Sequence, residues 1–323
     1  MAPTRARVWT ALWVVYLVWG STYLAIRVVV HPSHGTGLPP LLAAGVRFGV
    51  AGLLMLAFTV RQPARDGRPD PLGTRQWLSA AIVGTSLLLG GNGLVSLAEK
   101  RVASGPAAVI IATVPIWAAL VGAITGQERV TLKHAAGLGL GFAGVAALVV
   151  GSGSGRADVT GVLLLVGAAL SWAAGSVWSR TAPLVRRPLV MTGMQMLCGG
   201  LACALVGLAS GELGQTHLGQ VPAQSWLAIG YLAIVGSMVG YTAYVWLLGN
   251  APLSLVTTYA YVNPLVAVLL GALLLHERLT VRTALATVAI VTGVALMVRR
   301  PRERHQATPA SSPAPNEPQQ QCA

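Results

Sequence analysis

Ten long apolar stretches constrain this chain more than any other feature of its sequence. Each has about 18 residues or more, the length that an α-helix needs to cross the hydrocarbon core of a bilayer. They take up most of the 323 residues, of which 54% are hydrophobic and 10% charged. The stretches are 8–30, 38–60, 76–97, 103–125, 132–150, 159–179, 189–210, 223–248, 252–275 and 281–298. The sequence therefore predicts an all-α integral membrane protein with ten transmembrane helices, and it excludes soluble enzyme domains.

Membrane topology explains the net charge of +13 better than nucleic-acid binding does. Most Lys and Arg residues flank the apolar stretches, and no folded soluble face remains to carry a basic patch, so no nucleic-acid partner is expected. A cytoplasmic N-terminus places fifteen of these residues inside and five outside. We therefore expect a multi-pass protein of the inner or plasma membrane with both termini in the cytoplasm. The Pro- and Gln-rich segment 299–323 is expected to form a disordered cytoplasmic tail.

Cysteine, histidine and acidic residues are too few and too scattered to indicate a metal or redox site. Cys198 and Cys203 share one apolar stretch and Cys322 lies in the tail, so no disulfide framework or CxxC site is available. No HExxH motif occurs, and no His, Asp or Glu lies at the middle of a stretch. We therefore expect no cofactor and no metal. An intramembrane enzyme would need a positioned nucleophile and base, which these stretches do not supply.

The chain matches itself at an offset of 149 residues. At that offset Pro115 meets Pro264, Glu128-Arg129 meets Glu277-Arg278, and Gly91 meets Gly240. At slightly different offsets Trp19 meets Trp172, and Gly45 and Gly52 meet Gly193 and Gly200. The duplication predicts a first five-helix repeat in residues 1–150 and a second in residues 151–298.

An odd number of helices in each repeat means that the second copy enters the membrane from the opposite side. Inverted repeats of this kind are the architecture of alternating-access carriers, which bind substrate near the midplane between the two halves. Channels can also arise by duplication, and the repeat alone leaves that alternative open.

Several short motifs, in the same order over residues 8–298, resemble the EamA-type branch of the drug/metabolite transporter superfamily. These are the run from Trp19 to Arg27, the pair Arg47-Phe48, the entry Ser104-Gly105-Pro106-Ala107-Ala108, and the spacing from Pro115 to Glu128 that recurs from Pro264 to Glu277. The resemblance implies a ten-helix carrier with a cavity lined by helices 1, 3, 4, 6, 8 and 9. It also implies export of amino acids, drugs or related metabolites, without identifying the cargo.

Charged residues within the stretches are candidates for substrate binding. Arg27 and Arg47 lie inside apolar stretches, where an ionisable side chain is costly and often functional. Either could instead extend its stem to the interface; if it faces a cavity, it favours a carboxylate-bearing substrate. Glu128 and Glu277 are interpreted as helix-end partners of neighbouring Arg residues rather than proton sites. Helix 1 lacks the glutamate that small multidrug exporters of the superfamily use, so coupling to protons stays open.

Uncharged polar and aromatic residues supply the remaining candidates. Thr85, Asn92, Ser96 and Glu99 share one face of the third helix, and such a stripe serves either a cavity or contacts between helices. Tryptophan also anchors helices at membrane interfaces. The candidate substrate-binding residues are Trp19, Thr22, Arg27, Arg47, Asn92, Trp117, Trp172, Tyr241, Tyr244, Tyr259 and Asn263, with Pro115 and Pro264 as candidate hinges.

The sequence thus favours a secondary transporter that exports a small organic metabolite by alternating access at a central cavity. A facilitative, channel-like permease is the main alternative, and an intramembrane enzyme or a structural scaffold is less well supported. The expected partners are the small-molecule substrate and the bilayer, and faces of small residues permit a homodimer.

Overall fold

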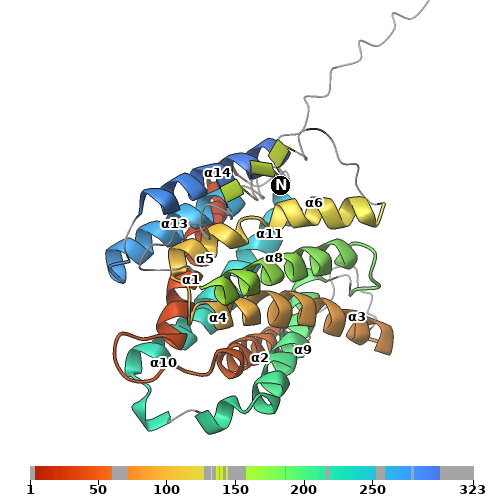
Figure 1. Cartoon of the computed structure of the whole chain (residues 1–323). Coiled ribbons are helices and arrows are strands. Elements are labelled where there is room, and N and C mark those ends of the chain that lie inside the picture. The colour runs from red at the N-terminus through yellow and green to blue at the C-terminus, as the bar shows by residue number, and fades with distance from the viewer. Residues whose placement is uncertain are drawn as a thin grey trace, which may run out of the picture.

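The fold is a bundle of helices (Figure 1). The computed structural model describes residues 4–59, 72–126, 132, 136–137, 139–140, 143–144, 158–185, 187–215, 218–251, 259–277 and 280–298. Among these residues no strand occurs. The helices of the first half are α1 (Arg5–Val30), α2 (Pro40–Thr59), α3 (Thr74–Gly84), η1 (Thr85–Gly93), α4 (Leu94–Ala98), α5 (Ser104–Ile111) and α6 (Val114–Ile124). Those of the second half are α8 (Val159–Ser179), α9 (Pro188–Ala209), η2 (Glu212–Gln215), η3 (Leu218–Gln220), α10 (Ala223–Tyr231), η4 (Leu232–Val239), α11 (Gly240–Asn250), α13 (Tyr259–Leu274) and α14 (Val281–Val298).

Seven helices in the described residues are long and apolar enough to cross a membrane. They are Arg5–Val30, Pro40–Thr59, Thr74–Ala98, Ser104–Ile124, Val159–Ser179, Pro188–Ala209 and Ala223–Tyr244. Two shorter apolar helices, Val262–Leu274 and Val281–Gly293, correspond to the last two predicted spans. The predicted fifth span, 132–150, lies largely outside the described residues. The all-helical membrane fold is therefore confirmed, whereas the number ten stays a prediction.

Two spans contain π-helical turns at matching places. In the third span η1 joins α3 to α4, and in the eighth span η4 joins α10 to α11. The segment η1 contains three glycines, and η4 contains Gly236 and is followed by Gly240. Glycine has low helix propensity and lets a helix widen locally. Such turns are frequent at functional sites because they redirect side chains.

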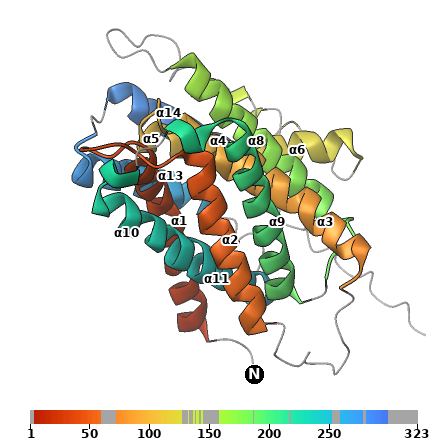
Figure 2. The same cartoon turned by 90° about the horizontal axis from the view of Figure 1, so that it is seen from below.

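The helices α2 and α9 pack closely through glycines (Figure 2). A Cβ atom added at Gly200 would lie 2.5 Å from the Gly49 nitrogen and 3.1 Å from the Gly45 oxygen, and one added at Gly52 would lie 2.8 Å from the Gly193 oxygen. Small residues in membrane helices allow this approach of backbones. Glycines that match in the duplication, Gly45 with Gly193 and Gly52 with Gly200, thus lie at this helix contact.

The connections at one end of the bundle contact one another. Thr36 N donates to the Gln220 carbonyl at 3.2 Å, and Arg101 pairs with Asp158 at 2.7 Å. The Glu212 carboxylate accepts hydrogen bonds from the backbone N–H groups of Leu41 and Leu42 at the start of α2. We call this end the capped end; it comprises residues 31–39, 99–103, 158, 211–215, 218–222 and 275–277.

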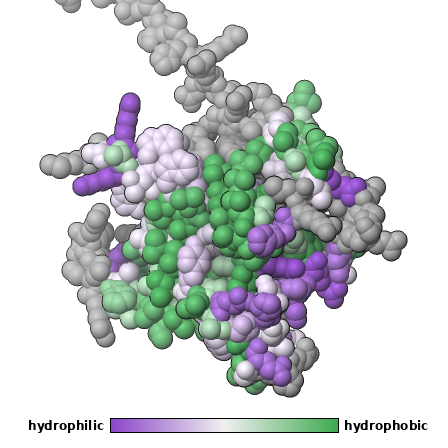
Figure 3. All heavy atoms as spheres, turned by 90° about the vertical axis from the view of Figure 1, so that its left-hand side faces the viewer, coloured by the Kyte–Doolittle hydropathy of each residue, from purple (hydrophilic) through white to green (hydrophobic). Residues whose placement is uncertain are grey.

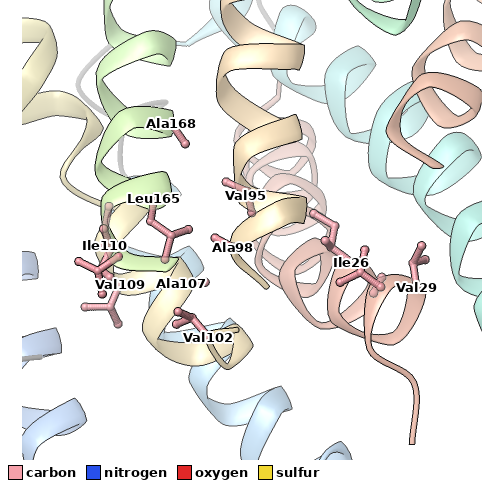
Figure 4. Close-up of a cluster of buried hydrophobic side chains, with 14 of the residues drawn as sticks. Ile26, Val29, Val95, Ala98, Val102, Ala107, Val109, Ile110, Leu165 and Ala168 are labelled. Atoms are coloured by element: carbon pink, nitrogen blue, oxygen red, sulfur yellow. The ribbon is translucent and has the colours of Figure 1, made fainter. Parts of the chain in front are cut away.

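Beside the capped end lies the largest cluster of buried apolar side chains. Figure 4 shows part of it, with Ile26 and Val29 on α1, Val95 and Ala98 on α4, and others on α5 and α8. Because helices of both halves contribute, the cluster holds the two halves of the sequence together at this level.

Large apolar side chains also cover much of the outer surface. Leu53 of α2 is 60% exposed and Leu163 of α8 is 66% exposed. On the face in Figure 3, hydrophobic residues occupy the middle and hydrophilic residues lie toward the margins. A surface of this kind suits lipid rather than water.

Candidate functional site

A cavity lies between the two halves of the chain, with about 930 Å³ of space free of atoms, including the part open to solvent. It is lined by Trp19, Thr22, Tyr23, Ile26, Arg47, Gly91, Asn92, Val95, Ala108, Ile111, Ala112, Val114, Pro115, Ala168, Trp172, Gly236, Tyr241, Tyr259, Asn263 and Pro264. The lining comes from the first, third, fourth, sixth, eighth and ninth spans, which the family resemblance implies, and from Arg47 of the second.

One wall of the cavity is aromatic. The Trp19 ring centroid lies 5.3 Å from that of Tyr241 and 5.2 Å from that of Tyr259, both in edge-to-face geometry. Tyr244 lies behind this wall, 5.0 Å from Trp19 and 5.9 Å from Tyr259, but does not itself line the cavity. Such a wall contacts the apolar body of a ligand and, through its ring faces, a cationic group.

Each of the two cavity tryptophans packs against a glycine of the other half. A Cβ atom added at Gly240 would lie 2.6 Å from Trp19 Nε1, and one added at Gly91 would lie 2.7 Å from Trp172 Cε3. The two glycines meet at the 149-residue offset, and the two tryptophans also occupy matching positions. The glycines are thus required at these positions because any side chain would displace the indole rings.

Arg47 is a buried cation in the cavity wall, only 6% exposed. Its Nε donates to Ser237 Oγ at 3.1 Å, and its guanidinium carbon lies 4.5 Å from the Phe48 ring centroid. Within the described residues neither of its two terminal nitrogens donates a hydrogen bond. These N–H groups are therefore available to a ligand carboxylate.

Asn263 adds an acceptor to the wall, next to a proline. It is 7% exposed, and its side-chain oxygen has no hydrogen-bond partner among the described residues. Pro264 follows it inside the continuous helix α13, whereas Pro115 is the second residue of α6, just after the break that separates α6 from α5. Both prolines line the cavity. The structure thus places the two candidate hinges in different local settings.

Asn92 reaches the cavity from the π-helical segment η1. Ser96, one turn later, is buried and its hydroxyl donates to the Asn92 carbonyl at 3.0 Å. The polar residues predicted on one face of the third span therefore have different roles. Asn92 faces the cavity, whereas the Ser96 hydroxyl donates to a backbone carbonyl of its own helix.

The structure does not bring Arg27 or Trp117 to the cavity wall. Arg27 Nη1 donates to the backbone carbonyls of Glu99 and Val102, because the side chain leaves the last turn of α1 toward the capped end. Trp117 lies one turn into α6 and is half-buried outside the lining.

Several wall residues were missed by the sequence analysis. Tyr23 and Ile26 follow Trp19 by four and seven residues. This spacing places all three on one face of the helix, so the sequence could have indicated them. Small residues such as Ala108 and Ala168 gave no signal because alanine is common throughout the chain.

The described acidic residues Glu99 and Glu277 lie at helix ends. Glu99 directly follows α4, and it is 0% exposed. Glu277 accepts hydrogen bonds from Ser104 N and Oγ, both at 2.9 Å, and from Gly105 N at 3.2 Å. Its described partners thus belong to the start of α5, while Arg278 and Glu128 lie outside the described residues.

The described residues contain no cluster of three or more His, Cys, Asp or Glu side chains that could hold a metal ion. The wall itself supplies donors on Arg47, an acceptor on Asn263 and aromatic surface around them.

Comparison with known proteins gives the family. The model of the EamA-like transporter family matches residues 8–150 and again residues 159–299. The chain belongs to the EamA-like transporter family. As a member it is a multi-pass membrane transporter of small molecules and not an enzyme, and its partners are that substrate and lipid.

Relatives of this EamA-like transporter carry transporter names. It is 40% identical over 291 residues to the "uncharacterized inner membrane transporter YedA" of Escherichia coli K12, and the match covers 89% of each chain. It is 28% identical to an E. coli K12 protein named "probable amino-acid metabolite efflux pump", over 88% of this chain and 92% of that one. A solved crystal structure covers 91% of this chain and 97% of its own with a TM-score of 0.59 at 21% identity, a likeness that shows the fold alone.

Proposed function

We propose that this EamA-like transporter exports small organic metabolites of the amino-acid type from the cytoplasm by alternating access. In this proposal it has ten transmembrane helices as two inverted five-helix repeats, residues 1–150 and 151–298. The distribution of Lys and Arg supports a protein of the inner or plasma membrane with both termini in the cytoplasm. In this orientation the capped end lies outside. The family model, matching twice, supports the repeat boundaries.

Contacts between matched positions support the inverted symmetry. Trp19 packs on Gly240 while Trp172 packs on Gly91, and each pair joins the two halves. The contact of Gly52 with Gly193 likewise mirrors that of Gly45 with Gly200. A pseudo-twofold axis between the halves would relate each contact to its mate, as in carriers built from inverted repeats.

The observation that carries the substrate class is the pair of unsatisfied polar groups in one apolar wall. Arg47 offers donors suited to a carboxylate, and the Asn263 side-chain oxygen offers an acceptor suited to an ammonium group. A free amino acid carries both charges. Trp19, Tyr241 and Tyr259 would contact its side chain. The efflux name of one relative supports the direction.

Counterflow in liposomes tests the proposal. Vesicles with purified protein are loaded with one unlabelled amino acid and diluted into the same labelled one, and the protein amino acids are tried singly. Saturable uptake is expected for the wild type and a loss of about tenfold or more for Arg47→Met, because one charge-assisted pair is worth about 1.5–3 kcal/mol. Arg75→Met removes an exposed arginine at the start of α3 and should leave uptake unchanged.

The facilitative alternative predicts a different result. Uptake that rises linearly with concentration and is equal in wild type and Arg47→Met would indicate a channel-like permease. Absence of counterflow with every amino acid would reject the proposed substrate class.

A further inference from the structure

Glu99 is a fully buried carboxyl group that the wall chemistry does not use. It follows α4 directly, it is 0% exposed, and neither of its carboxylate oxygens has a hydrogen-bond partner among the described residues. Ala98, directly before it, and Val102, three residues after it, belong to the apolar cluster of Figure 4. A charged carboxylate in such a place is highly unfavourable, and a protein normally pairs it or neutralises it.

The nearest candidate for a counter-ion does not pair with it. Arg27 interacts electrostatically with Glu99, but its Nη1 donates to the backbone carbonyls of Glu99 and Val102 rather than to the carboxylate. In the part of the chain that the structure describes, these two side chains form no ion pair. The cation thus donates to carbonyl oxygens, and the carboxyl group of Glu99 is left without a direct donor among the described residues.

A second carboxyl group at the capped end has the opposite environment. Glu277 accepts three hydrogen bonds at the start of α5, as an ionised carboxylate does. The two acids interact electrostatically. When two nearby carboxyl groups have such different surroundings, the one without donors retains the proton.

Glu99 also adjoins the cavity. Val95, one helical turn before it, lines the cavity, and so does Tyr23, which interacts electrostatically with Glu99. The charged and titratable groups that act on Glu99 are Tyr23 and Arg27 from α1, Arg47 from α2 and Glu277 after α13. A movement of the capped end would therefore alter the surroundings of both the Glu99 carboxyl group and the cavity wall.

We propose that Glu99 is a proton-binding site that is loaded when the capped end closes and released when it opens. On closure the carboxylate takes one proton from a hydronium ion: an O–H bond of that ion breaks to leave water, an O–H bond forms on the carboxyl group, and the group is then buried as the neutral acid. On opening, water reaches the group and accepts that proton, because a hydrated glutamate is ionised at neutral pH. Because the proton returns to the side of the membrane from which it came, Glu99 makes transport depend on pH without carrying protons across the membrane. This dependence rests on the proposed function, whereas the proton site itself does not.

Infrared spectroscopy tests the proton site without any substrate. Protein with ¹³C-labelled glutamate carboxyl groups is reconstituted in lipid at about pH 7. The wild type should show the carbonyl stretch of a protonated glutamic acid, shifted by the label. Glu99→Gln should lack this band, and Asp158→Asn, which removes a partly exposed acid at the same end, should retain it. The proposal is overturned if the wild type has no such band or if Glu99→Gln retains it in full.

Folding is checked separately so that a misfolded variant is not mistaken for a positive result. Glutamine copies the shape of the neutral acid, so Glu99→Gln should melt at the wild-type temperature or above. If this variant fails to fold, the wild-type band is compared with that of Glu277→Gln: an equal band supports the proposal, and its loss in Glu277→Gln overturns the choice of Glu99.

Transport then tests the dependence on pH. Net uptake of the radiolabelled amino acids is measured at equal pH on both sides of the vesicles, between about pH 6 and pH 8. The wild-type rate should change by about threefold or more over that range, and the rate of Glu99→Gln by much less, because its titrating group is gone. Uptake that is indifferent to pH in the wild type overturns this dependence. Absence of uptake together with the infrared band rejects the proposed substrate class and leaves the proton site standing.

Discussion

Single residues set the shape of the cavity wall where an indole ring lies on a glycine. Gly240→Ala would put a Cβ atom 2.6 Å from Trp19 Nε1, so the ring must shift toward the cavity. We expect a loss of roughly 1–3 kcal/mol in the free energy of unfolding, as in other overpacked sites, together with weaker amino-acid binding. Denaturant unfolding in mild detergent and tryptophan fluorescence would measure both effects.

The matched control for this substitution is Gly230→Ala in α10, where an added Cβ atom meets no other atom within 4 Å. It should change stability by less than about 1 kcal/mol. Combining Gly240→Ala with Trp19→Leu should recover part of the loss, since the two residues are in contact and their effects are not additive. Equal stability of the two alanine variants would contradict the role of Gly240.

At the scale of elements, acidic side chains from distant segments cap helices at the capped end. Glu277 binds the first N–H groups of α5, and Glu212 binds those of Leu41 and Leu42 in α2. Helix N-termini leave such groups without partners and favour negative charge. Glu277→Ala should destabilise the fold by about 1–3 kcal/mol because buried donors lose their acceptor. Glu277→Gln keeps an oxygen acceptor and should lose less; thermal denaturation and amide exchange at Ser104 and Gly105 measure the difference.

The cap of α8 has a pH dependence that can be derived from its contacts. The hydrogen bond from Arg101, and then that from the Gly161 N–H, hold the pKa of Asp158 below its usual value. A lowered pKa in the folded state means that the unfolded state binds protons first, so the stabilisation is complete above about pH 4 and is lost as the pH falls through the folded value. Asp158→Ala should therefore melt below the wild type at neutral pH, and the two melting curves should converge in acid. A difference that stays constant with pH would show that the cap makes no titrating contribution.

These elements also mark what the sequence can and cannot predict. The spans, and the cavity positions of Trp19, Trp172, Tyr259 and Asn263, follow from apolar length, helical spacing and the duplication, which are local or repeated signals. The cap of α2 by Glu212 joins residues 170 apart in the sequence, and nothing local indicates that partner. The burial of Glu99 at the end of α4 depends on tertiary packing, and so do the hydrogen bonds from Arg27 to backbone carbonyls. Neither follows from the local sequence.

At the scale of the whole molecule, alternating access requires the capped end to separate. The backbone hydrogen bond from Thr36 to Gln220 joins the connection after α1 to η3, one from each half of the chain. Residues bonded in this way are close enough for a disulfide, whose Cα atoms lie roughly 4.4–6.8 Å apart. The pair Thr36→Cys and Gln220→Cys, in a protein whose Cys198, Cys203 and Cys322 are replaced by alanine, should therefore form a reversible lock.

Oxidation of this pair should reduce amino-acid counterflow to the level of protein-free vesicles, and a reductant should restore it. The same treatment should not affect either single-cysteine variant, because a lone thiol has no partner to lock. Closure should also exclude water from Glu99. The infrared band of the protonated acid should therefore persist to higher pH in the oxidised, locked protein than in the reduced protein. Counterflow that continues at full rate in the locked protein would mean that substrate leaves without separation of these two connections, and would contradict alternating access at the capped end.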